Sequence, residues 1–289
     1  MNLESASAIA RELGLDQHGM KIQALSGTDT AKTFFLGTPS EPVFIKIRPL
    51  SRGALLSAEA DGLQALADTG VVRVPRVIGR GMLEDEAWLA LEWLELSALD
   101  ERGDAALGEQ IGLLHRHTAD QFGWHRNNHI GTTPQINQQR SSWTDFFIDQ
   151  RIAYQLKRLE HRQPDTRWQQ YLKPLVEAWT AVSQDHDPAP SLIHGDLWVG
   201  NAGRIQGQTP VIFDPATHYA DRECDLAMAA LFGGFHDEFF AAYNRIWPLR
   251  EDHLLRRPFY QLYHLLNHAN MFGSQYIATA RRMIERLIA

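Results

Sequence analysis

Residues 192–201 read Leu192-Ile-His194-Gly-Asp196-Leu-Trp198-Val-Gly-Asn201, and no other stretch of the chain says more about its fold and chemistry. The pattern has the form His-x-Asp-x-x-x-x-Asn. Asp214 follows thirteen residues after Asn201, at the end of a short apolar run that begins at Val211. Two acids and an asparagine at these spacings suit phosphoryl transfer, in which one carboxylate accepts the proton of an attacking hydroxyl and hard oxygen ligands bind Mg²⁺.

The same residues have a plainer interpretation, in which His194 and Asp196 only stabilise a turn and Asp214 only ends a strand. Either half of the pattern alone leaves that interpretation open. The two halves together, in this order and at this spacing, favour the catalytic interpretation.

A second pair of charged residues lies upstream. Lys46 belongs to the predicted strand 43–47, and Glu59 lies on the apolar stripe of the predicted helix 55–68. A carboxylate on an apolar stripe is costly to bury without a partner, and Lys46 is the natural one. The alternative is that both side chains reach solvent, as most Lys and Glu do. The downstream motif favours the pair, because a Lys–Glu pair orients a lysine toward ATP phosphates.

Composition excludes several classes of protein. The 289 residues carry 28 Lys and Arg against 35 Asp and Glu, a net charge of −7, so we expect no nucleic-acid partner. No run approaches the roughly 20 apolar residues of a membrane span. The first residues lack the basic and apolar regions of a secretory signal, so we expect no membrane association and a cytoplasmic location. The single cysteine, Cys224, excludes an intramolecular disulfide.

The order of predicted elements divides the chain into two parts. The first 95 residues combine strands at 33–36, 43–47 and 88–94 with one helix at 55–68. The rest is mainly helical, with helices near 107–118 and 143–159, a long loop at 122–140 and a strand-rich stretch near 190–215. We therefore place a boundary between residues 95 and 96.

The chain resembles the fructosamine kinase family, also called ketosamine-3-kinases, over nearly its whole length. The stretches that carry the resemblance are His194–Asn201, Val211–Ala216, Asp221–Met228, Leu231–Phe235 and Tyr260–His268. The family belongs to the protein-kinase-like fold, in the branch shared with aminoglycoside and choline phosphotransferases. The resemblance implies an α+β bilobal fold. A small mixed lobe with an antiparallel sheet (1–95) lies over a larger, mainly helical lobe (96–289), with ATP between them.

The resemblance also implies an activity. It is the ATP- and Mg²⁺-dependent phosphorylation of a ketosamine at O3 of its sugar, on a small molecule or on a protein lysine. Ketosamines are rearranged adducts of sugars with amines, and phosphorylation at O3 makes them release the amine, which is a deglycation repair. Bacterial-type relatives suggest ribulosamines as the preferred substrates.

By position, the resemblance assigns roles to the charged motif residues. Asp196 is the catalytic base, and Asn201 and Asp214 bind Mg²⁺. Lys46 contacts the ATP phosphates, and Glu59 holds Lys46.

Further positions match the adenine hinge and the supports of the catalytic loop. Leu91, Glu92 and Leu94 belong to the hinge, where the Glu92 carbonyl and the Leu94 amide meet adenine. His194 and Asp225 have structural roles, Asp225 as the acid that braces the catalytic loop.

Two segments depart from the kinase pattern. Pro215 follows Asp214 where protein kinases have Phe-Gly, and because proline restricts φ we expect a rigid metal loop. The predicted phosphate loop, residues 25–33, has one glycine and no G-x-G-x-x-G signature. It also lacks the cysteine that permits redox control in some family members, so we expect no such redox control in this protein.

The acceptor side is less defined by the sequence. Trp198 either stacks on a sugar or packs in the core, and Asn128 in the 122–140 loop either binds substrate hydroxyls or folds the loop. Two other functions remain open. One is a kinase for an aminoglycoside or choline, although the 122–140 loop lacks the acids that a polycation needs. The other is a pseudokinase that binds nucleotide without catalysis. The oligomeric state is left open.

Overall fold

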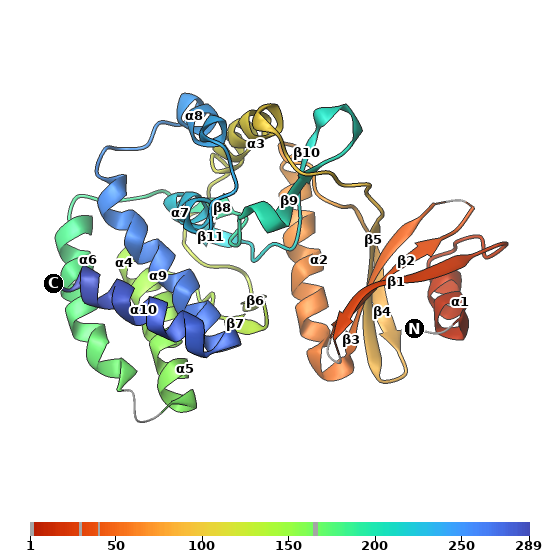
Figure 1. Cartoon of the computed structure of the whole chain (residues 1–289), viewed down its shortest axis with the longest axis horizontal. Coiled ribbons are helices and arrows are strands. Elements are labelled where there is room, and N and C mark those ends of the chain that lie inside the picture. The colour runs from red at the N-terminus through yellow and green to blue at the C-terminus, as the bar shows by residue number, and fades with distance from the viewer. Residues whose placement is uncertain (1–2, 29–30, 40, 164–166) are drawn as a thin grey trace.

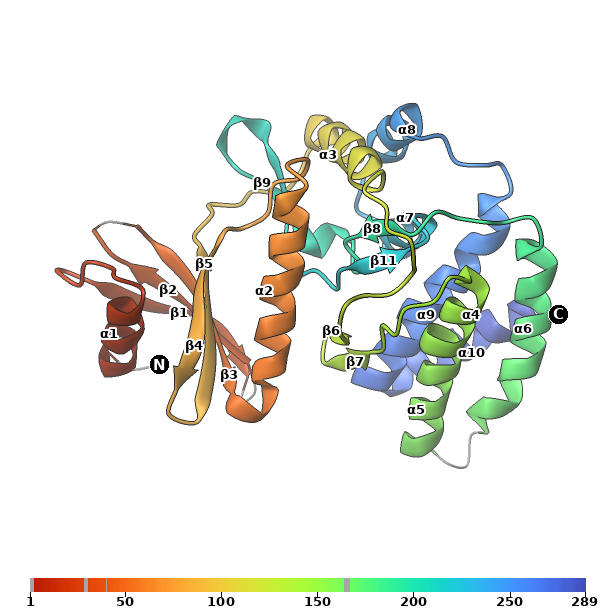
Figure 2. The same cartoon turned by 180° about the vertical axis from the view of Figure 1, so that it is seen from behind.

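The computed structural model describes residues 3–28, 31–39, 41–163 and 167–289. A lobe built on a sheet lies beside a larger helical lobe, as the expected α+β bilobal fold requires (Figure 1). Helix α2 (Gly53–Asp68) stands between them in both views (Figure 2). Among the described residues, no helix has the length and apolar character that a membrane span requires.

The small lobe forms an antiparallel sheet because apolar residues alternate along its strands. In β3 (Val43–Pro49), Val43, Ile45 and Ile47 are buried on one face, whereas Lys46 lies on the other. The strand order is β1-β2-β3-β5-β4. The remaining strands are β1 (Lys21–Thr28), β2 (Ala31–Gly37), β4 (Val77–Leu83) and β5 (Glu86–Glu92). The strands predicted at 33–36 and 43–47 are confirmed, and the one predicted at 88–94 ends at Glu92.

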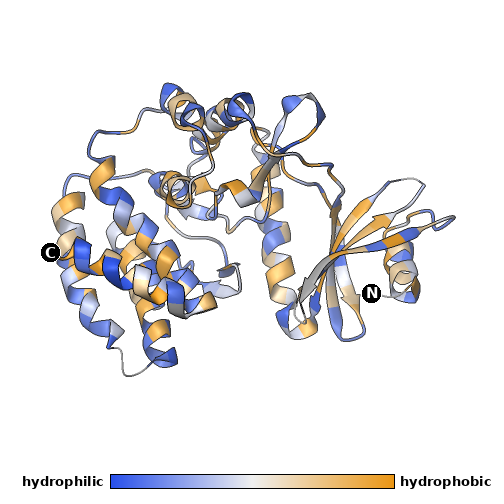
Figure 3. Cartoon of the chain, in the orientation of Figure 1, coloured by the Kyte–Doolittle hydropathy of each residue, from blue (hydrophilic) through white to orange (hydrophobic). Residues whose placement is uncertain are grey.

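Two helices cover the two faces of this sheet. Helix α1 (Leu3–Glu12) packs Ile9 against the core that contains Ile45 and Trp88, while α2 packs Leu63 against Leu89 on the other side. Hydrophobic residues, orange in Figure 3, recur along the strands between these helices and are interleaved with hydrophilic ones. The prediction of a single helix in the first 95 residues was therefore wrong, because α1 precedes the sheet.

The larger lobe is mainly helical. Its helices are α3 (Glu101–Leu114), α4 (Trp143–Phe147), α5 (Tyr154–Arg162), α6 (Leu172–Ser183), α7 (Glu223–Leu231), α8 (Asp237–Ile246), α9 (His253–Phe272) and α10 (Ser274–Leu287). The single helix predicted at 143–159 is interrupted, because a π-helical segment, Ile148–Ala153, joins α4 to α5. The rings of Trp143, Phe147, Trp179 and Tyr260 pack together in the core of this lobe.

Three short antiparallel pairs complete this lobe. They are β8 (Ser191–Ile193) with β11 (His218–Ala220), β9 (Ala202–Arg204) with β10 (Pro210–Ile212), and β6 (Asn128–Ile130) with β7 (Thr133–Gln135). The strand-rich stretch predicted near 190–215 is confirmed. The predicted loop 122–140 instead contains the β6–β7 hairpin.

One apolar core cluster connects the two lobes. It runs from Leu63 of α2 through Leu91 of β5 to Leu107 of α3, and it includes Leu197 between β8 and β9. The boundary predicted at residues 95 and 96 falls in the connection between β5 and α3. The segment with the His-x-Asp motif is thus packed where the lobes meet.

Candidate active site

The loop after β8 carries the motif residues, and a glycine allows its sharp turn. Gly195 has a φ of +83°, and a Cβ there would lie 2.3 Å from the Ala216 carbonyl oxygen. Only glycine fits both conditions. The Gly in His-Gly-Asp therefore brings the loop of residues 194–201 close to the segment that follows Asp214.

Asp225, near the start of α7, holds this loop in place through hydrogen bonds to its backbone. Its carboxylate accepts hydrogen bonds from the backbone N–H groups of His194 (2.7 Å) and Gly195 (2.8 Å). The His115 ring lies 3.2 Å from the same carboxylate. Burial acts to raise the pKa of Asp225, but these hydrogen bonds and the neighbouring histidines lower it below its usual value. The residue therefore acts as a buried anion that fixes the backbone.

His194 joins this loop to the strand that leads to Asp214. Its buried ring lies with Nε2 3.0 Å from the Phe213 carbonyl oxygen, so Nε2 carries the proton that this contact requires. Nδ1 then accepts the Asp196 backbone N–H at 3.3 Å. The histidine therefore sets the spacing between the two acids of the motif.

Asp196 and Asn201 face each other across the loop. Asn201 Nδ2 donates to the Asp196 carboxylate at 3.1 Å and to its backbone carbonyl at 2.9 Å. Burial, with smaller contributions from the charges of Asp214 and Asp225, raises the pKa of Asp196 to about 7, against the opposing effect of the Asn201 hydrogen bond. A carboxylate with such a pKa is suited to take up a proton near neutral pH.

Lys46, Glu59 and Asp214 form a charged cluster opposite the loop. Lys46 Nζ donates to Glu59 Oε1 at 2.7 Å, so the predicted pair is present, and it also contacts Asp214. Burial acts to lower the pKa of Lys46, but the two carboxylates raise it above its usual value. Burial also raises the pKa of Glu59. The lysine is therefore held charged in the cleft.

The backbone around Asp214 is tightly constrained. Asp214 has a φ of +55°, unusual for a residue with a side chain, and Pro215 follows it. Helix α2 packs closely here, since a Cβ on Gly62 would lie 3.2 Å from the Pro215 ring. This arrangement agrees with the rigid loop that the sequence predicts.

A cavity of about 500 Å³ lies beside β3 and the end of β5. Leu91, Glu92 and Leu94 line it, as do Lys46 and Asp214. It has the position expected for a nucleotide, and we call it the nucleotide cavity.

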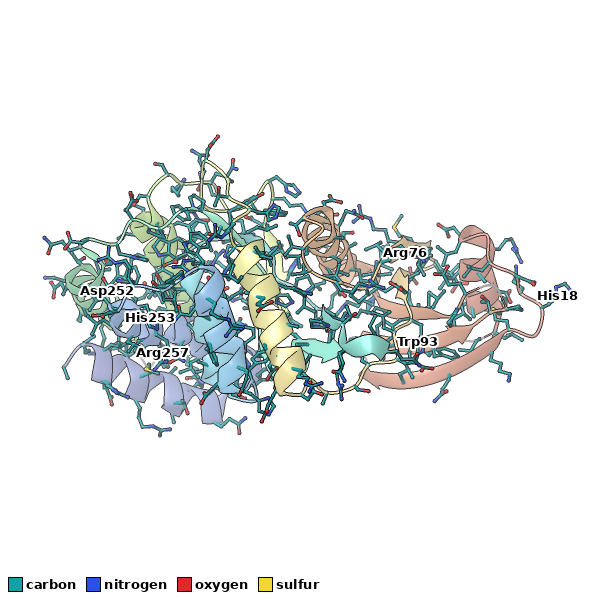
Figure 4. The ribbon with its side chains drawn as sticks, turned by 90° about the horizontal axis from the view of Figure 1, so that it is seen from above. His18, Arg76, Trp93, Asp252, His253 and Arg257 are labelled. Carbon is teal, nitrogen blue, oxygen red and sulfur yellow. The ribbon has the colours of Figure 1, made fainter. Side chains whose placement is uncertain are left out.

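Side chains outside this cavity hold the end of β5 and the residue after it, which line the cavity. The Glu92 carboxylate accepts from Arg73 at 2.6 Å and from the Arg76 backbone N–H at 3.1 Å. Trp93, labelled on the small lobe in Figure 4, packs edge-on against Phe35 with ring centroids 4.7 Å apart. The predicted phosphate loop, 25–33, differs from the expectation, because β1 runs to Thr28 and β2 begins at Ala31. Residues 29–30 lie outside the described part of the chain.

A second cavity, of about 280 Å³, adjoins the first. Its lining includes Asp196, Trp198, Asn201, Asn128, His129 and His268. We call it the acceptor cavity. The structure thus brings every predicted catalytic, metal and substrate residue to its walls, and the predicted hinge residues to the neighbouring cavity.

Trp198 and Asn128 occupy this wall differently. Trp198 is half-buried, with its ring edge toward Phe232 at a centroid distance of 6.1 Å. Asn128 is buried. Its side chain donates to the Thr217 carbonyl at 2.8 Å and accepts from Gln135 (2.8 Å) and Asn137 (2.7 Å). The Asn128 amide therefore folds the loop, whichever contact it makes with a substrate.

The lining residues that were not predicted as site residues include three basic ones: Arg48, His129 and His268. Arg48 had a signal, since residues two apart on a strand share a face and Lys46 was already placed there. His129 and His268 come from the β6–β7 hairpin and α9, which are far from the motif in sequence.

Comparison with known proteins agrees with this geometry. The family model for fructosamine kinase matches residues 1–289. A probable ketoamine kinase from Synechocystis is 36% identical over 98% of this chain and 95% of its own length. One from Enterococcus faecium is 38% identical over 92% of this chain and 94% of its own length.

Solved structures extend the comparison. A candidate fructosamine-3-kinase from Thermobifida fusca is 31% identical and superposes with a TM-score of 0.84, covering 98% of this chain and 99% of that one. Another from Haemophilus somnus is 28% identical, with a TM-score of 0.87 and coverage of 99% and 97%. An aminoglycoside phosphotransferase, 15% identical with a TM-score of 0.63 and 98% coverage of both chains, shares the fold. The chain therefore belongs to the fructosamine kinase family of phosphotransferases and has its kinase-like fold.

Proposed function

We propose that this protein transfers the γ-phosphoryl group of ATP to O3 of the sugar of a ketosamine, free or on a protein lysine, and so promotes deglycation. One observation carries the proposal. Asp196 lies in the acceptor cavity, and that cavity meets the nucleotide cavity at Lys46 and Asp214. A hydroxyl bound beside Asp196 therefore faces the end of a nucleotide bound beside Lys46.

Asp196 acts as the general base in this proposal. It takes the proton of the sugar hydroxyl as the hydroxyl oxygen attacks the γ-phosphorus and ADP leaves. The raised pKa of Asp196 makes the carboxylate a better proton acceptor than an exposed aspartate. Asp225 and His194 hold the loop in position for this step.

Asn201 and Asp214 fit the ligand preference of Mg²⁺. Asn201 uses its amide nitrogen for Asp196, which leaves its oxygen as a donor for a cation, and Asp214 supplies a carboxylate. Amide and carboxylate oxygens are the hard ligands that Mg²⁺ prefers. When bound, the ion would neutralise charge on the ATP phosphates.

Lys46 and the hinge would orient ATP. Glu59 directs the Lys46 ammonium into the cleft, where it meets phosphate oxygens. At the other end of the nucleotide cavity, the backbone of Glu92 and Leu94 would meet adenine, and the Arg73 ion pair keeps that backbone in place.

The acceptor cavity fits a sugar better than a polycation. Trp198 offers a half-exposed ring of the kind on which a sugar stacks. Arg48 also lines this cavity, and among the described residues its charge has no ion-pair partner, which disfavours aminoglycosides with several ammonium groups. The ketosamine is therefore the acceptor that we propose.

The test is Mg²⁺-dependent ATP consumption with a panel of ribulose-lysine, fructose-lysine, kanamycin and choline, with Asp196→Asn as the control. Turnover confined to the ketosamines supports the proposal and ranks the two sugars. Turnover confined to kanamycin or choline would contradict the acceptor and keep the fold. Nucleotide binding without turnover on any acceptor would instead support a pseudokinase.

A further inference from the structure

Three residues border both cavities: Lys46, Arg48 and Asp214. A phosphoryl group that moves from a nucleotide in one cavity to a hydroxyl in the other passes between them. Lys46 and Asp214 already have proposed roles toward ATP and Mg²⁺. Arg48 has none so far.

The strand fixes where Arg48 points. Arg48 lies two residues after Lys46 in β3, so both side chains are on the sheet face that looks into the cleft, while Ile45 and Ile47 are buried on the other. Pairing with Ala87 of β5 holds the backbone at this position. The cation is thus placed by the sheet and not by a loop.

The two cations of β3 differ in their surroundings. Lys46 is paired with Glu59 and Asp214. By contrast, within the described part of the chain, no hydrogen bond or ion pair of less than 4 Å engages the half-buried Arg48 guanidinium. Glu59 and Asp214 act on its charge only from a distance. Its planar set of donors is therefore available to an incoming anion.

We propose that Arg48 is a catalytic residue that donates hydrogen bonds to the phosphoryl group during its transfer. The assignment rests on the phosphotransferase activity proposed above. In the step, the acceptor hydroxyl oxygen forms a bond to the γ-phosphorus, the bond from that phosphorus to the bridging oxygen of ADP breaks, and the hydroxyl proton goes to Asp196. The negative charge spread over the peripheral oxygens is what a guanidinium stabilises.

A carboxylate on the acceptor would be recognised by the same chemistry. The position of Arg48 at the junction of the cavities, beside Lys46 and Asp214, favours the phosphoryl group as its partner. Kinetics can distinguish a phosphoryl partner of Arg48 from a carboxylate partner. Every acceptor receives the phosphoryl group, whereas only some acceptors carry a carboxylate.

The experiment compares Arg48→Met and Arg48→Lys with a matched control, Arg52→Met. Arg52 is an exposed arginine close enough to affect the charge of Arg48, but it lines neither cavity. Two readouts are measured with Mg²⁺ present. The first is kcat and KM with a ketosamine that has no carboxylate and with one that has. The second is calorimetric binding of ADP alone and of ADP with aluminium fluoride, which mimics the phosphoryl group in transfer.

We expect Arg48→Met to lower kcat by roughly 10²- to 10³-fold with both acceptors, as loss of a transition-state donor does. Binding of ADP with aluminium fluoride should weaken by a comparable factor. Binding of ADP alone should persist, which also shows that the variant is folded. Arg48→Lys should recover part of the rate, because an ammonium keeps the charge without the fork of donors. Arg52→Met should behave like the wild type.

Equal kcat values for Arg48→Met and Arg52→Met, with unchanged aluminium fluoride binding, would overturn the proposal. A rise in KM confined to the carboxylate-bearing acceptor would also overturn it, since Arg48 would then recognise the acceptor. If the wild type phosphorylates no ketosamine, the proposed function fails separately, and the aluminium fluoride measurement still tests Arg48.

Discussion

The two sides of the cleft are held in different ways. The loop of residues 194–201 is fixed by buried hydrogen bonds to Asp225 and by a glycine turn. The nucleotide side is fixed by strand pairing and by charges, above all Lys46 with Glu59 and Asp214. A bound nucleotide would redistribute those charges but would leave the hydrogen bonds of the loop in place. We therefore expect the loop to be preorganised for chemistry, and the nucleotide side to change more when a ligand binds.

The largest effect should come from the base itself. Asp196→Asn should lower kcat by at least about 10²-fold, because a positioned base is lost. ADP affinity should stay near the wild-type value, since Asp196 lines the acceptor cavity and not the nucleotide cavity. Steady-state kinetics and calorimetry check both expectations. A near-normal kcat would show that Asp196 is not the base.

The frame of the loop should be nearly as sensitive. Gly195→Ala places a Cβ 2.3 Å from a carbonyl oxygen at a φ of +83°, so unfolding free energy should fall by about 3 kcal/mol or more. Gly207→Ala is the matched control, with a φ of +81° and no atom within 4 Å. It should cost only about 1–2 kcal/mol. Equal losses in urea unfolding would contradict the close packing of the loop.

A buried histidine in the larger lobe, His264, should make the stability of the protein fall in acid. Burial lowers the pKa of His264 to about 3, so the unfolded chain binds the proton first and stability is lost as pH falls below about 6.5. Between pH 7 and 5, the stability of His264→Gln relative to wild type should improve by about 2 kcal/mol. His18, exposed on the small lobe, provides the control His18→Gln, which removes a histidine but no buried ring. A pH-independent difference for His264→Gln would contradict a buried neutral ring.

The smallest effect is expected on the nucleotide side. Glu59→Gln removes one charge-assisted partner of Lys46, which keeps Asp214, so KM for ATP should rise about tenfold. Asp68→Asn, at the exposed end of the same helix, should leave KM unchanged. If Glu59→Gln lowered kcat as much as Asp196→Asn, the proposed difference between the nucleotide side and the loop side of the cleft would be wrong.

Sequence reasoning reached the charged centre because its signals are local. The spacing of His194, Asp196 and Asn201 is preserved within one loop. Glu59 was recognisable because a carboxylate on an apolar stripe requires a partner, and Lys46 was the cation on a nearby strand. Both inferences concern charged or polar residues that would cost stability if they were buried without a partner or a function.

The remaining features depend on tertiary placement. His129 and His268 reach the acceptor cavity from separate elements, which no local pattern predicts. The interruption of the helix after Phe147 likewise has no breaker such as Pro or Gly in its sequence. Arg48 is the exception, since strand alternation alone would have placed it beside Lys46.

The most direct test of the account is to identify the product. Wild-type protein is incubated with ATP, Mg²⁺ and fructose-lysine or ribulose-lysine. Phosphorus and proton NMR then follow the products. We predict a phosphomonoester coupled to the proton at C3 of the sugar, followed by release of lysine, and neither signal with Asp196→Asn. Phosphate on another oxygen, or inorganic phosphate as the only product, would contradict transfer to O3 across the junction of the two cavities.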